Sequence, residues 1–377
     1  MGKPSMTDPS PSPRSQSPVV LVTGSSGLLG SRICERLAER YQVVGLDVEP
    51  PDSPVANCTW RRCDLTDQSD VEQTLKSVQD LVGESIASVI HLAAYYDFSG
   101  EPSPLYRELT VEGTRRLLEA LHEFSEVEQF IFSSSVLVMK PCEPGELLTE
   151  ESPTNAEWAY PQSKLDAEKE IRRHKKSIPA VILRIAGVYD EAGHSLPITQ
   201  NIRRIAEKQL ESYFFPGDAQ RGQAFVHLDD VAACFDRAVE SRHQLSPYET
   251  FLVAEDECLS YAQLQDLIGE LIFGTDDWPT IRIPKPVAKA GAWVKDQWAP
   301  SEDEEPFIKP WMVDLADAHY PVNTARARDR LGWEPTHRLS QTLPEMIRRL
   351  KKDPRRWYEV NNLACPDQAP VLPGVQE

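Results

Sequence analysis

The sequence predicts an α/β protein in which a doubly wound parallel sheet is followed by a smaller, mostly helical C-terminal lobe. Two observations predict this fold class. Short, nearly continuous apolar runs rich in Val and Ile recur in the first half of the chain, as is typical of strands buried on both faces of a parallel sheet. Longer segments with helical periodicity alternate with these runs, as is typical of sheets that helices cover on both sides.

The individual elements follow from the same two criteria, in chain order. The run VVLVTG at 19–24 is apolar and β-branched and ends in a glycine turn, so we expect a strand. Segment 70–82 repeats apolar residues at helical spacing, from Val71 to Leu81. The expected strands are 19–24, 42–47, 59–65, 88–94, 129–135 and 180–189, and the expected helices are 31–40, 70–82, 105–124 and the segment from Tyr160 onward.

Beyond residue 190 the strict alternation lapses, so this part is expected to form the second lobe. Helices are expected at 196–209, 229–241, 260–272 and 339–351, and strands at 251–255 and 280–284. The resulting boundaries are a disordered, Pro- and Ser-rich tail at 1–17, a sheet domain at 18–190 to which 225–256 return, a lobe formed by 191–224 and 257–352, and a tail at 353–377. The acidic loop at 300–306 and the last tail are expected to be solvated.

The composition excludes several classes of function. The formal net charge of −19 argues against nucleic acid as a partner, because phosphates require basic grooves, and against an anionic membrane surface. No apolar run approaches the length of a membrane span, and the first residues lack the apolar stretch of a signal peptide. The seven cysteines are scattered without a Cys-x-x-Cys pair, and no histidine joins a cysteine cluster at metal-ligand spacing. We therefore predict a cytoplasmic, metal-free protein that acts on a small molecule.

Three glycines in TGSSGLLG, residues 23–30, form the first candidate site. Gly24, Gly27 and Gly30 follow a strand and open a helix, so the backbone can approach a pyrophosphate that the helix N-terminus attracts. An ordinary tight turn is the alternative. Asp47 ends the next strand, where a carboxylate accepts hydrogen bonds from a ribose 2′-hydroxyl and repels a 2′-phosphate, unless it only caps the strand. Together these residues predict NAD as the cofactor in preference to NADP.

A tyrosine and a lysine four residues apart form the second candidate site. In EWAYPQSKLDAEKE, residues 157–170, Tyr160 and Lys164 lie one turn apart on the same face of an expected helix. A phenol titrates near ~10 and is a poor base at neutral pH unless a neighbouring ammonium lowers its pKa. The pair fits acid–base chemistry, but an ordinary helix with a half-buried tyrosine and a solvated lysine shows the same pattern.

These motifs, in this order, resemble those of the extended short-chain dehydrogenase/reductase superfamily, which includes the NAD-dependent epimerase/dehydratases. The resemblance runs from about Val19 to Lys351. It rests on TGSSGLLG (23–30), CDLTD (63–67), HLAA (91–94), FSSSVLV (132–138), YPQSK (160–164), FVHLDDVA (225–232) and ARARDRLGWEP (325–335). It implies a Rossmann-type fold and the use of NAD, but no particular substrate.

The resemblance also implies roles for individual residues. Tyr160 would exchange a proton with a substrate oxygen, Lys164 would lower the pKa of the phenol and hold the nicotinamide ribose, and Ser135, in preference to Ser134, would hydrogen-bond the substrate oxygen. The implied cofactor-binding residues are Gly24, Gly27, Leu28, Gly30, Asp47, Asp64, Leu65, Leu92, Ala93, Ala94, Tyr160 and Lys164. A homodimer formed through the helices that carry Thr110 and Tyr160 is implied as well.

Two departures from the family pattern bear on the substrate. Thr110 stands where the family usually has Asn, and a hydroxyl offers fewer hydrogen bonds to a proton relay than an amide. Gln223 stands where nucleotide-sugar enzymes carry an Arg that clamps a diphosphate, and the nearby Arg221 is out of register. Nucleotide sugars are therefore less favoured as substrates.

Aromatic residues favour a less polar substrate. Tyr95 and Tyr96 follow the fourth strand, where with Ser135 they are expected to bind the substrate, and the segment before the acidic loop adds Trp293 and Trp298. Both stretches resemble the hydroxysteroid dehydrogenase and dihydroflavonol reductase branch, although aromatic residues also serve as core packing. Three functions remain open: an NAD-dependent oxidoreductase for a secondary alcohol or ketone, a nucleotide-sugar epimerase or dehydratase with tightly bound NAD, and a non-catalytic NAD sensor.

Overall fold

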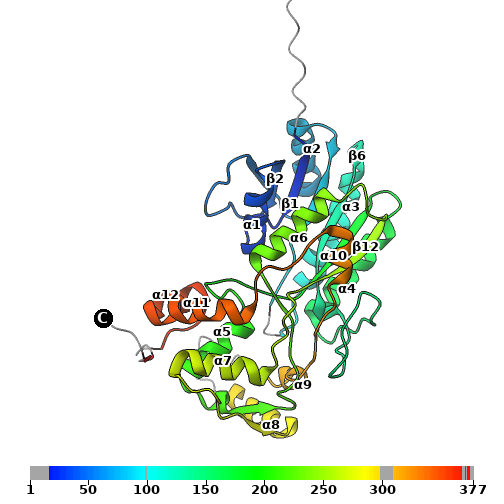
Figure 1. Ribbon diagram of the computed structural model, residues 1–377. Helices are drawn as coiled ribbons and strands as arrows, with labels where there is room; N and C mark the ends of the chain where they lie inside the picture. The colour runs from blue at the N-terminus through cyan, green and yellow to red at the C-terminus, as the bar shows by residue number, and fades with distance from the viewer. Residues whose placement is uncertain (1–16, 98–99, 298–308, 367–369, 371, 374–377) are drawn as a thin grey trace, which may run out of the picture.

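A parallel sheet of seven strands forms the centre of the protein (Figure 1). The structure is a computed structural model that describes residues 17–97, 100–297, 309–366, 370 and 372–373. The strands are β1 (Val19–Thr23), β2 (Gln42–Asp47), β3 (Cys58–Arg62), β5 (Ser88–His91), β7 (Phe130–Ser135), β8 (Ala180–Ile185) and β12 (Tyr248–Val253). Their order is β12-β8-β7-β5-β1-β2-β3, so the chain winds outward from β1 in both directions. The expected doubly wound parallel sheet is confirmed.

Each face of the sheet has its own helices, because successive side chains of a strand point to opposite faces. The face that includes Val20 and Ile131 packs against α1 (Leu28–Leu37) and α6 (Leu228–Glu240). The face that includes Leu21 and Phe130 packs against α2 (Gln68–Val82), α3 (Glu112–Ala120) and α4 (Ala159–His174). This three-layer arrangement buries β1, β5 and β8 completely, which explains why these strands read as continuous apolar runs, whereas the edge strand β3 is only half-buried.

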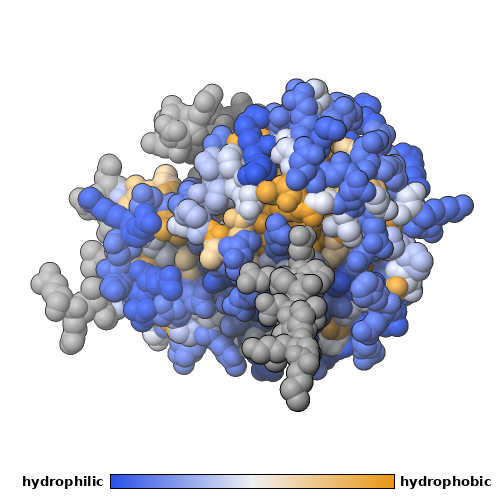
Figure 2. All heavy atoms as spheres, turned by 90° about the horizontal axis from the view of Figure 1, so that it is seen from above, coloured by the Kyte–Doolittle hydropathy of each residue, from blue (hydrophilic) through white to orange (hydrophobic). Residues whose placement is uncertain are grey.

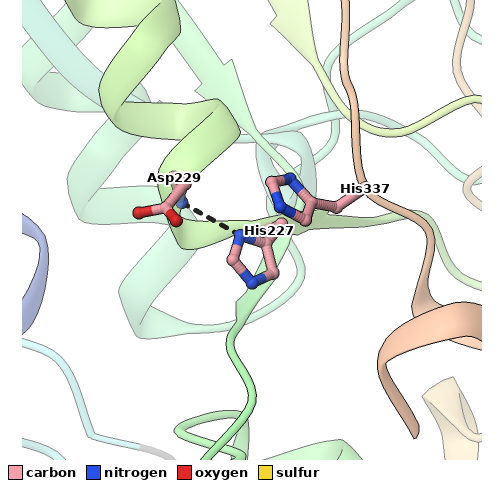
Figure 3. A group of neighbouring side chains, drawn as sticks. All are labelled: His227, Asp229 and His337. Carbon is pink, nitrogen blue, oxygen red and sulfur yellow. Dashed lines mark hydrogen bonds between the residues drawn. The ribbon is translucent and has the colours of Figure 1, made fainter.

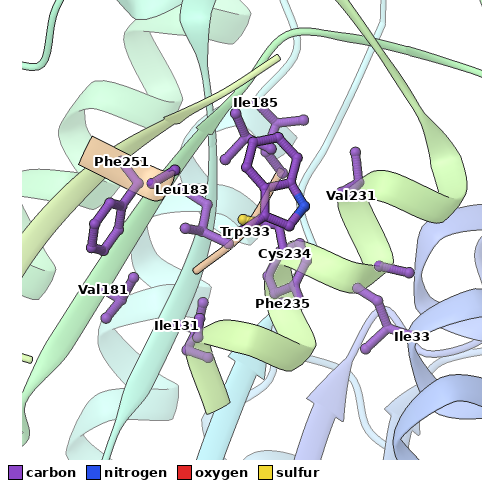
Figure 4. Close-up of a cluster of buried hydrophobic side chains, with 14 of the residues drawn as sticks. Ile33, Ile131, Val181, Leu183, Ile185, Val231, Cys234, Phe235, Phe251 and Trp333 are labelled. Carbon is purple, nitrogen blue, oxygen red and sulfur yellow. The ribbon is translucent and has the colours of Figure 1, made fainter. Parts of the chain in front are cut away.

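A late segment of the chain completes the core on the α1/α6 face. Helix α10 (Ala325–Leu331) leads to Trp333, which is 2% exposed and lies among Leu183, Ile185 and Cys234 (Figure 4). The Trp333 indole donates its N–H to the Asp230 carbonyl at 2.8 Å. Segment 325–333, expected in the second lobe, therefore packs on the sheet domain.

The second lobe lies below the sheet domain in Figure 1 and has a hydrophobic core of its own. Its helices are α5 (Leu196–Ala206), α7 (Tyr261–Phe273), α8 (Lys285–Gln297), α9 (Met312–Leu315), α11 (Leu339–Lys352) and α12 (Pro354–Val360). Helix α7 begins at a capping box in which Ser260 and Gln263 bond each other's backbone N–H groups. The mostly helical second lobe is thus confirmed.

The remaining elements are short. Strands β4 (Ser85–Ile86) and β6 (Glu126–Val127), β9 (Gly187–Tyr189) and β11 (Phe225–His227), and β10 (Phe214–Pro216) and β13 (Ile281–Ile283) form three pairs. A π-helix, η1 (Tyr106–Val111), precedes α3, and 3₁₀ turns occur at η2 (Leu121–Glu123), η3 (Val136–Val138) and η4 (Leu210–Tyr213).

Three expectations about individual elements were wrong. The strand expected at 88–94 ends at His91, because the chain then turns over the glycine loop and Ala93 N donates to Thr23 Oγ1. The strand expected at 180–189 divides at Ala186, and its last residues pair with β11 outside the main sheet. The helix expected at 105–124 begins as a π-helix.

The solvated tail expected after residue 352 is also wrong for 354–360, which form α12. Asp353 caps this helix by accepting a hydrogen bond from Arg356 N. Trp357 and Tyr358 are buried in the lobe core, and the Tyr358 hydroxyl donates to Glu207 at 2.6 Å. The burial of these two large rings stabilises the helix despite the polar composition of the segment. The N-terminal tail at 1–16 and the acidic loop at 300–306 lie outside the described residues.

The surface agrees with the charged composition. The face seen from above is mostly hydrophilic, with a small apolar area near its centre (Figure 2). None of the helices in the described part of the chain is long and apolar enough to cross a membrane.

Candidate active site

The carboxyl ends of β1, β5 and β7 lie at one edge of the sheet, and the winding direction reverses between β1 and β5. Open α/β sheets bind ligands in the crevice outside such an edge. The glycine turn follows β1, residues 92–95 follow β5, and Ser135 ends β7. The topology therefore brings the predicted cofactor-binding and catalytic residues to one place.

Two of the three glycines have no room for a side chain. Gly24 has a φ of 69°, and a Cβ there would lie 2.9 Å from Ala93 N. A Cβ on Gly30 would lie 2.0 Å from the Gly24 carbonyl oxygen. Gly27 is the N-cap of α1 and offers no side chain to the first N–H groups of the helix, where Leu28 is 42% exposed. The first N–H groups of α1 and the closely packed backbone of the glycine loop suit a pyrophosphate.

Asp47 lies beside this loop at the end of β2. Its Oδ2 accepts a hydrogen bond from Ser26 N (3.0 Å) and its Oδ1 one from Val48 N (2.8 Å). Oδ1 also accepts from Glu49 N at 3.5 Å, whereas Oδ2 keeps a second lone pair with which it can accept a hydrogen bond from a ribose hydroxyl. Asp64 follows β3, and its Oδ1 accepts from the Thr66 hydroxyl (2.6 Å) and backbone N–H (2.9 Å), which lowers the pKa of Asp64.

Apolar residues complete the crevice around the glycine loop. Leu65 is buried, and Leu92, Ala93 and Ala94 are half-buried at the end of β5. Leu92 N donates to the Thr23 carbonyl at 3.2 Å, which fixes the segment beside β1. The glycine cradle, the ribose-facing carboxylate and this apolar surface together fit NAD.

Ser135, Tyr160 and Lys164 are brought together at the same edge. Tyr160 is the second residue of α4 and is hydrogen-bonded to Ser135. Lys164, one turn later, is 3% exposed and donates from Nζ to the Ser133 carbonyl at 2.7 Å. Its ammonium lies 4.9 Å from the centre of the Phe132 ring and 5.9 Å from that of Tyr160. This burial excludes the ordinary helix with a solvated lysine.

Ser134 faces away from this group. Its hydroxyl donates to Glu168 Oε1 at 2.6 Å in a buried contact. Ser135, whose Oγ also accepts from Leu137 N at 3.2 Å, therefore remains the serine placed to meet a substrate oxygen.

Burial controls the proton affinities of the site. It raises the pKa of the Tyr160 phenol above its ordinary value, while the Ser135 hydrogen bond acts in the opposite direction. Burial lowers the pKa of Lys164 to about 7, and the charge of Glu168 opposes this change. At neutral pH Tyr160 is thus protonated, and Lys164 holds its proton less firmly than an exposed lysine does.

Aromatic rings surround the Tyr160 phenol. The ring of Tyr96 lies 4.8 Å from that of Tyr160 at 77°, and Trp158 lies 5.5 Å from it. Trp311, from the second lobe, lies 5.3 Å from Trp158. Tyr95 packs instead on Tyr106, with ring centroids 4.8 Å apart. The structure therefore places Tyr96, but not the Tyr95 ring, against the catalytic tyrosine.

Sequence reasoning missed two of these rings. Trp158 lies two residues before Tyr160, but at that position a tryptophan is equally typical of helix-start packing. Trp311 comes about 150 residues later in a segment without periodicity. Trp293, which the sequence offered instead, is 58% exposed on α8, and Trp298 lies outside the described residues.

Two further polar residues, His91 and Thr110, form hydrogen bonds next to the site. His91 is fully buried between the hydroxyls of Thr23 (2.7 Å) and Thr114 (2.9 Å), and burial together with the Lys164 charge lowers its pKa to about 3. Thr110 Oγ1 accepts a hydrogen bond from Tyr95 N at 3.0 Å, so its hydroxyl holds the loop after β5 in place.

The candidate diphosphate clamp is engaged elsewhere. Arg221 forms an ion pair with Glu143 at 2.5 Å. Gln223 forms a parallel bridge with Tyr320, and its side-chain amide faces Gly187. Glu143 engages only the Nη2 of Arg221, and the buried Nε of the same guanidinium has no hydrogen-bond partner in the described part of the chain, whereas Gln223 carries no positive charge.

Among the described residues, His227, Asp229 and His337 form a group with metal-ligand side chains (Figure 3). The two imidazoles are stacked, with centroids 3.9 Å apart and planes 18° from parallel. Lone pairs that lie in nearly parallel planes do not converge on one ion. His227 Nδ1 already accepts from Asp229 N (3.2 Å), and the Asp229 carboxylate pairs with Arg32 (2.8 Å). This geometry does not fit a metal centre.

Fold and site together define a dinucleotide-binding protein in which a serine, a tyrosine and a lysine lie at the edge of the sheet that carries the glycine loop. A model of the NAD dependent epimerase/dehydratase family matches residues 20–254. The chain belongs to this family and is an NAD-dependent enzyme of the extended short-chain dehydrogenase/reductase type, with NAD as its cofactor.

Proteins similar to this chain bear the names of different kinds of enzyme. The chain is 27% identical over 270 residues to a protein of Bacillus subtilis named "Uncharacterized UDP-glucose epimerase YtcB", covering 67% of this chain and 81% of the relative. It is 26% identical over 361 residues to human 3 beta-hydroxysteroid dehydrogenase type 7, covering 86% of this chain and 93% of the relative.

Solved structures confirm the fold. MoeE5 in complex with UDP-glucuronic acid and NAD superposes with a TM-score of 0.64 at 20% identity, covering 88% of this chain and 99% of that one. A dTDP-glucose 4,6-dehydratase from Bacillus anthracis in complex with NAD gives a TM-score of 0.65 at 17% identity, covering 91% and 99%.

Proposed function

We propose that the protein is an NAD-dependent oxidoreductase that interconverts a secondary alcohol and a ketone on a small, weakly polar molecule. The observation that carries this proposal is the setting of the Tyr160 phenol. On one side it meets the polar pair Ser135 and Lys164, and on the other the rings of Tyr96 and Trp158.

Bound NAD supplies hydride acceptance and donation. The residues of the chain handle the proton. Tyr160 donates its proton to the carbonyl oxygen in the reductive direction and accepts one from the hydroxyl in the oxidative direction. Because burial raises the pKa of the phenol, the oxidative direction requires a nearby positive charge, which the Lys164 ammonium provides. Ser135 hydrogen-bonds the same substrate oxygen and stabilises the developing alkoxide.

The aromatic rings favour an apolar substrate body. Trp158 and Trp311 present flat apolar surface beside Tyr160, whereas Arg221 is neutralised by Glu143. A diphosphate next to this surface would have to compete with Glu143 for the Arg221 guanidinium. Tyr96, at 54% exposure, forms the edge of the expected substrate entrance.

A nucleotide-sugar epimerase or dehydratase is the second candidate, favoured by the name of the Bacillus subtilis relative. Such an enzyme takes hydride from its substrate and returns it, so it gains from holding NAD throughout the cycle. A non-catalytic NAD sensor would need the glycine loop but not Ser135, Tyr160 and Lys164 in mutual contact.

The first experiment asks whether the purified protein carries NAD and exchanges it with labelled NAD. Rapid exchange and NADH formation with apolar secondary alcohols would support the proposal. Tightly held NAD together with turnover of UDP- or dTDP-sugars would overturn it in favour of the epimerase.

A tyrosine variant then tests the mechanism. Tyr160→Phe is expected to bind NAD normally and to lose turnover by roughly 10²–10⁴-fold. Tyr41→Phe is a matched control, because Tyr41 precedes β2 at the opposite edge of the sheet. Full turnover in Tyr160→Phe would contradict the assigned chemistry, and an NAD-binding protein inactive on every substrate class would favour the sensor.

We also propose the domain division, location and assembly. Residues 18–190 with 225–256 form the NAD-binding domain, on which 325–333 also pack, and 191–224 with the rest of 257–352 form the substrate lobe, which α12 extends. The protein is proposed to be a cytoplasmic homodimer that pairs through α4 and the helix containing Thr110, with light scattering as the test of assembly.

A further inference from the structure

Glu168 is a buried carboxylate to which the proposed chemistry gives no role. It is 3% exposed and lies on α4, one turn after Lys164 and two turns after Tyr160. Ser134 Oγ donates to its Oε1 at 2.6 Å. Arg184 donates Nε to Oε1 at 3.1 Å and Nη2 to Oε2 at 2.8 Å, and is itself 5% exposed. Three hydrogen bonds from two strands therefore fix both carboxylate oxygens.

The strand register explains why this pair lies under the active site. Ser134 of β7 is directly opposite Arg184 of β8 in the parallel ladder, so both side chains reach the same carboxylate. The Ser133 carbonyl accepts a hydrogen bond from the Lys164 ammonium, and Ser135 is hydrogen-bonded to Tyr160. Three consecutive residues of β7 are thus attached to positions 160, 164 and 168 of α4. Sliding or rotating the helix would break all three attachments at once.

The charges around Lys164 give the carboxylate a second effect. The titratable groups that face Lys164 in the described structure are His91 from β5 and Tyr160 and Glu168 from α4, with Arg184 of β8 behind Glu168. His91 is neutral because burial lowers its pKa to about 3. Glu168 is thus the anion of this group, and it favours the charged form of a lysine that burial would neutralise.

We propose that Glu168 is a positioning residue for proton transfer: it keeps α4 in register with β7 and keeps the Lys164 ammonium charged beside the Tyr160 hydroxyl. The inference rests on the proposed function of the same site. Glu168 touches neither the substrate oxygen nor the cofactor-binding loop and acts through Lys164. Arg184 in turn pairs with the buried carboxylate through two hydrogen bonds.

The test measures the titration of Lys164 directly, without a substrate. The full-length protein is acetylated with trace acetic anhydride between pH 5 and 10, and mass spectrometry of the Lys164 peptide gives its titration midpoint. Lys169, on the same helix and 57% exposed, is the internal control. In Glu168→Gln the Lys164 midpoint is expected to fall by about one pH unit, because a neighbouring negative charge is lost. Glu168→Asp, which retains the charge, is expected to restore most of the shift.

A double variant guards against misfolding. Glu168→Gln alone leaves Arg184 buried without a counter-charge, whereas Glu168→Gln with Arg184→Gln replaces both charges by amides. The Lys164 midpoint is expected to fall in this variant too, but by less, because the positive charge of Arg184 is removed together with the negative charge of Glu168. An unchanged midpoint in the folded Gln variants would overturn the inference, as would a loss of kcat/KM at every pH without a shift of the pH profile. Failure of the proposed function is separate, because it would appear as full turnover in Tyr160→Phe.

Discussion

Replacing Gly30 by alanine tests the packing of the cofactor loop in the absence of any ligand. The new Cβ would lie 2.0 Å from the Gly24 carbonyl oxygen and 2.8 Å from Ser25 Cα, and both neighbours are backbone atoms that cannot rotate away. Ordinary contacts need more than a further 1 Å, so α1 must move away from the loop. Overpacking of this kind costs about 1–3 kcal/mol, and the better helix propensity of alanine returns about 0.5–1 kcal/mol.

The net loss, about 1 kcal/mol at the middle of these ranges, is expected to lower the thermal unfolding midpoint of the ligand-free protein by about 1–2 °C, because the unfolding entropy of a chain of this length is large. Displacement of the loop is expected to weaken NAD binding at least tenfold in calorimetry. A Gly30→Ala protein with unchanged unfolding and unchanged NAD affinity would refute the packing argument.

Gly27→Ala is the matched control, because it separates packing from cofactor approach. Its Cβ would lie 3.6 Å from the Gly24 carbonyl oxygen, an ordinary contact, and its φ of −72° suits any residue. Stability should therefore change by less than about 1 kcal/mol. NAD affinity should still fall, because the methyl group occupies the approach of the pyrophosphate. Wild-type affinity in Gly27→Ala would place the pyrophosphate elsewhere.

Three further predictions concern separate parts of the protein. Asp47→Ala should weaken NAD binding and reduce the ratio of NAD affinity to NADP affinity, which calorimetry with each dinucleotide measures. An unchanged ratio would show that Asp47 does not contact the ribose. Trp311→Ala should raise KM for an apolar ketone without changing the NAD dissociation constant; equal effects on both would indicate loss of the fold. Burial raises the pKa of Glu255 from 4.5 to about 7, so ionising it destabilises the folded protein as pH rises through this range. The amide oxygen of Glu255→Gln can keep the hydrogen bonds from Tyr189 and Leu339. In denaturant unfolding, the free energy of unfolding of this variant should therefore exceed that of the wild type by about 1–3 kcal/mol at pH 8 and by little at pH 4.5. An equal increase at both pH values would contradict this prediction.

The part of the site that sequence predicted is the part that depends on strand ends. Gly24, Leu92 and Ser135 each follow or end an apolar run, and the carboxyl ends of parallel strands meet at one edge of a sheet. Their proximity therefore follows from the alternation of strands and helices. Tyr160 and Lys164 needed only the helical spacing and the resemblance to be placed beside them.

Contacts between distant segments could not be predicted in this way. Trp311 reaches Trp158 across about 150 residues, and no periodicity marks the segment that carries it. Glu168 reads as an ordinary polar residue of an amphipathic helix, and only the pairing of β7 with β8 shows that Arg184 lies opposite Ser134. The α12 helix was missed because two buried rings, Trp357 and Tyr358, stand in a strongly charged stretch.

The difference between the two enzymatic candidates lies in what holds the remote end of the substrate. Both use the same tyrosine, lysine and serine, so the catalytic residues cannot separate them. An epimerase must release the sugar ring to turn over while a clamp retains the diphosphate, and a clamp needs unpaired cationic donors. In this protein Gln223 carries no positive charge, and a diphosphate would have to displace the Glu143 carboxylate to use Arg221 fully. A substrate that binds against apolar rings instead gains its affinity from the apolar surface that it buries there. Binding of this kind suits a substrate that enters, reacts once and dissociates.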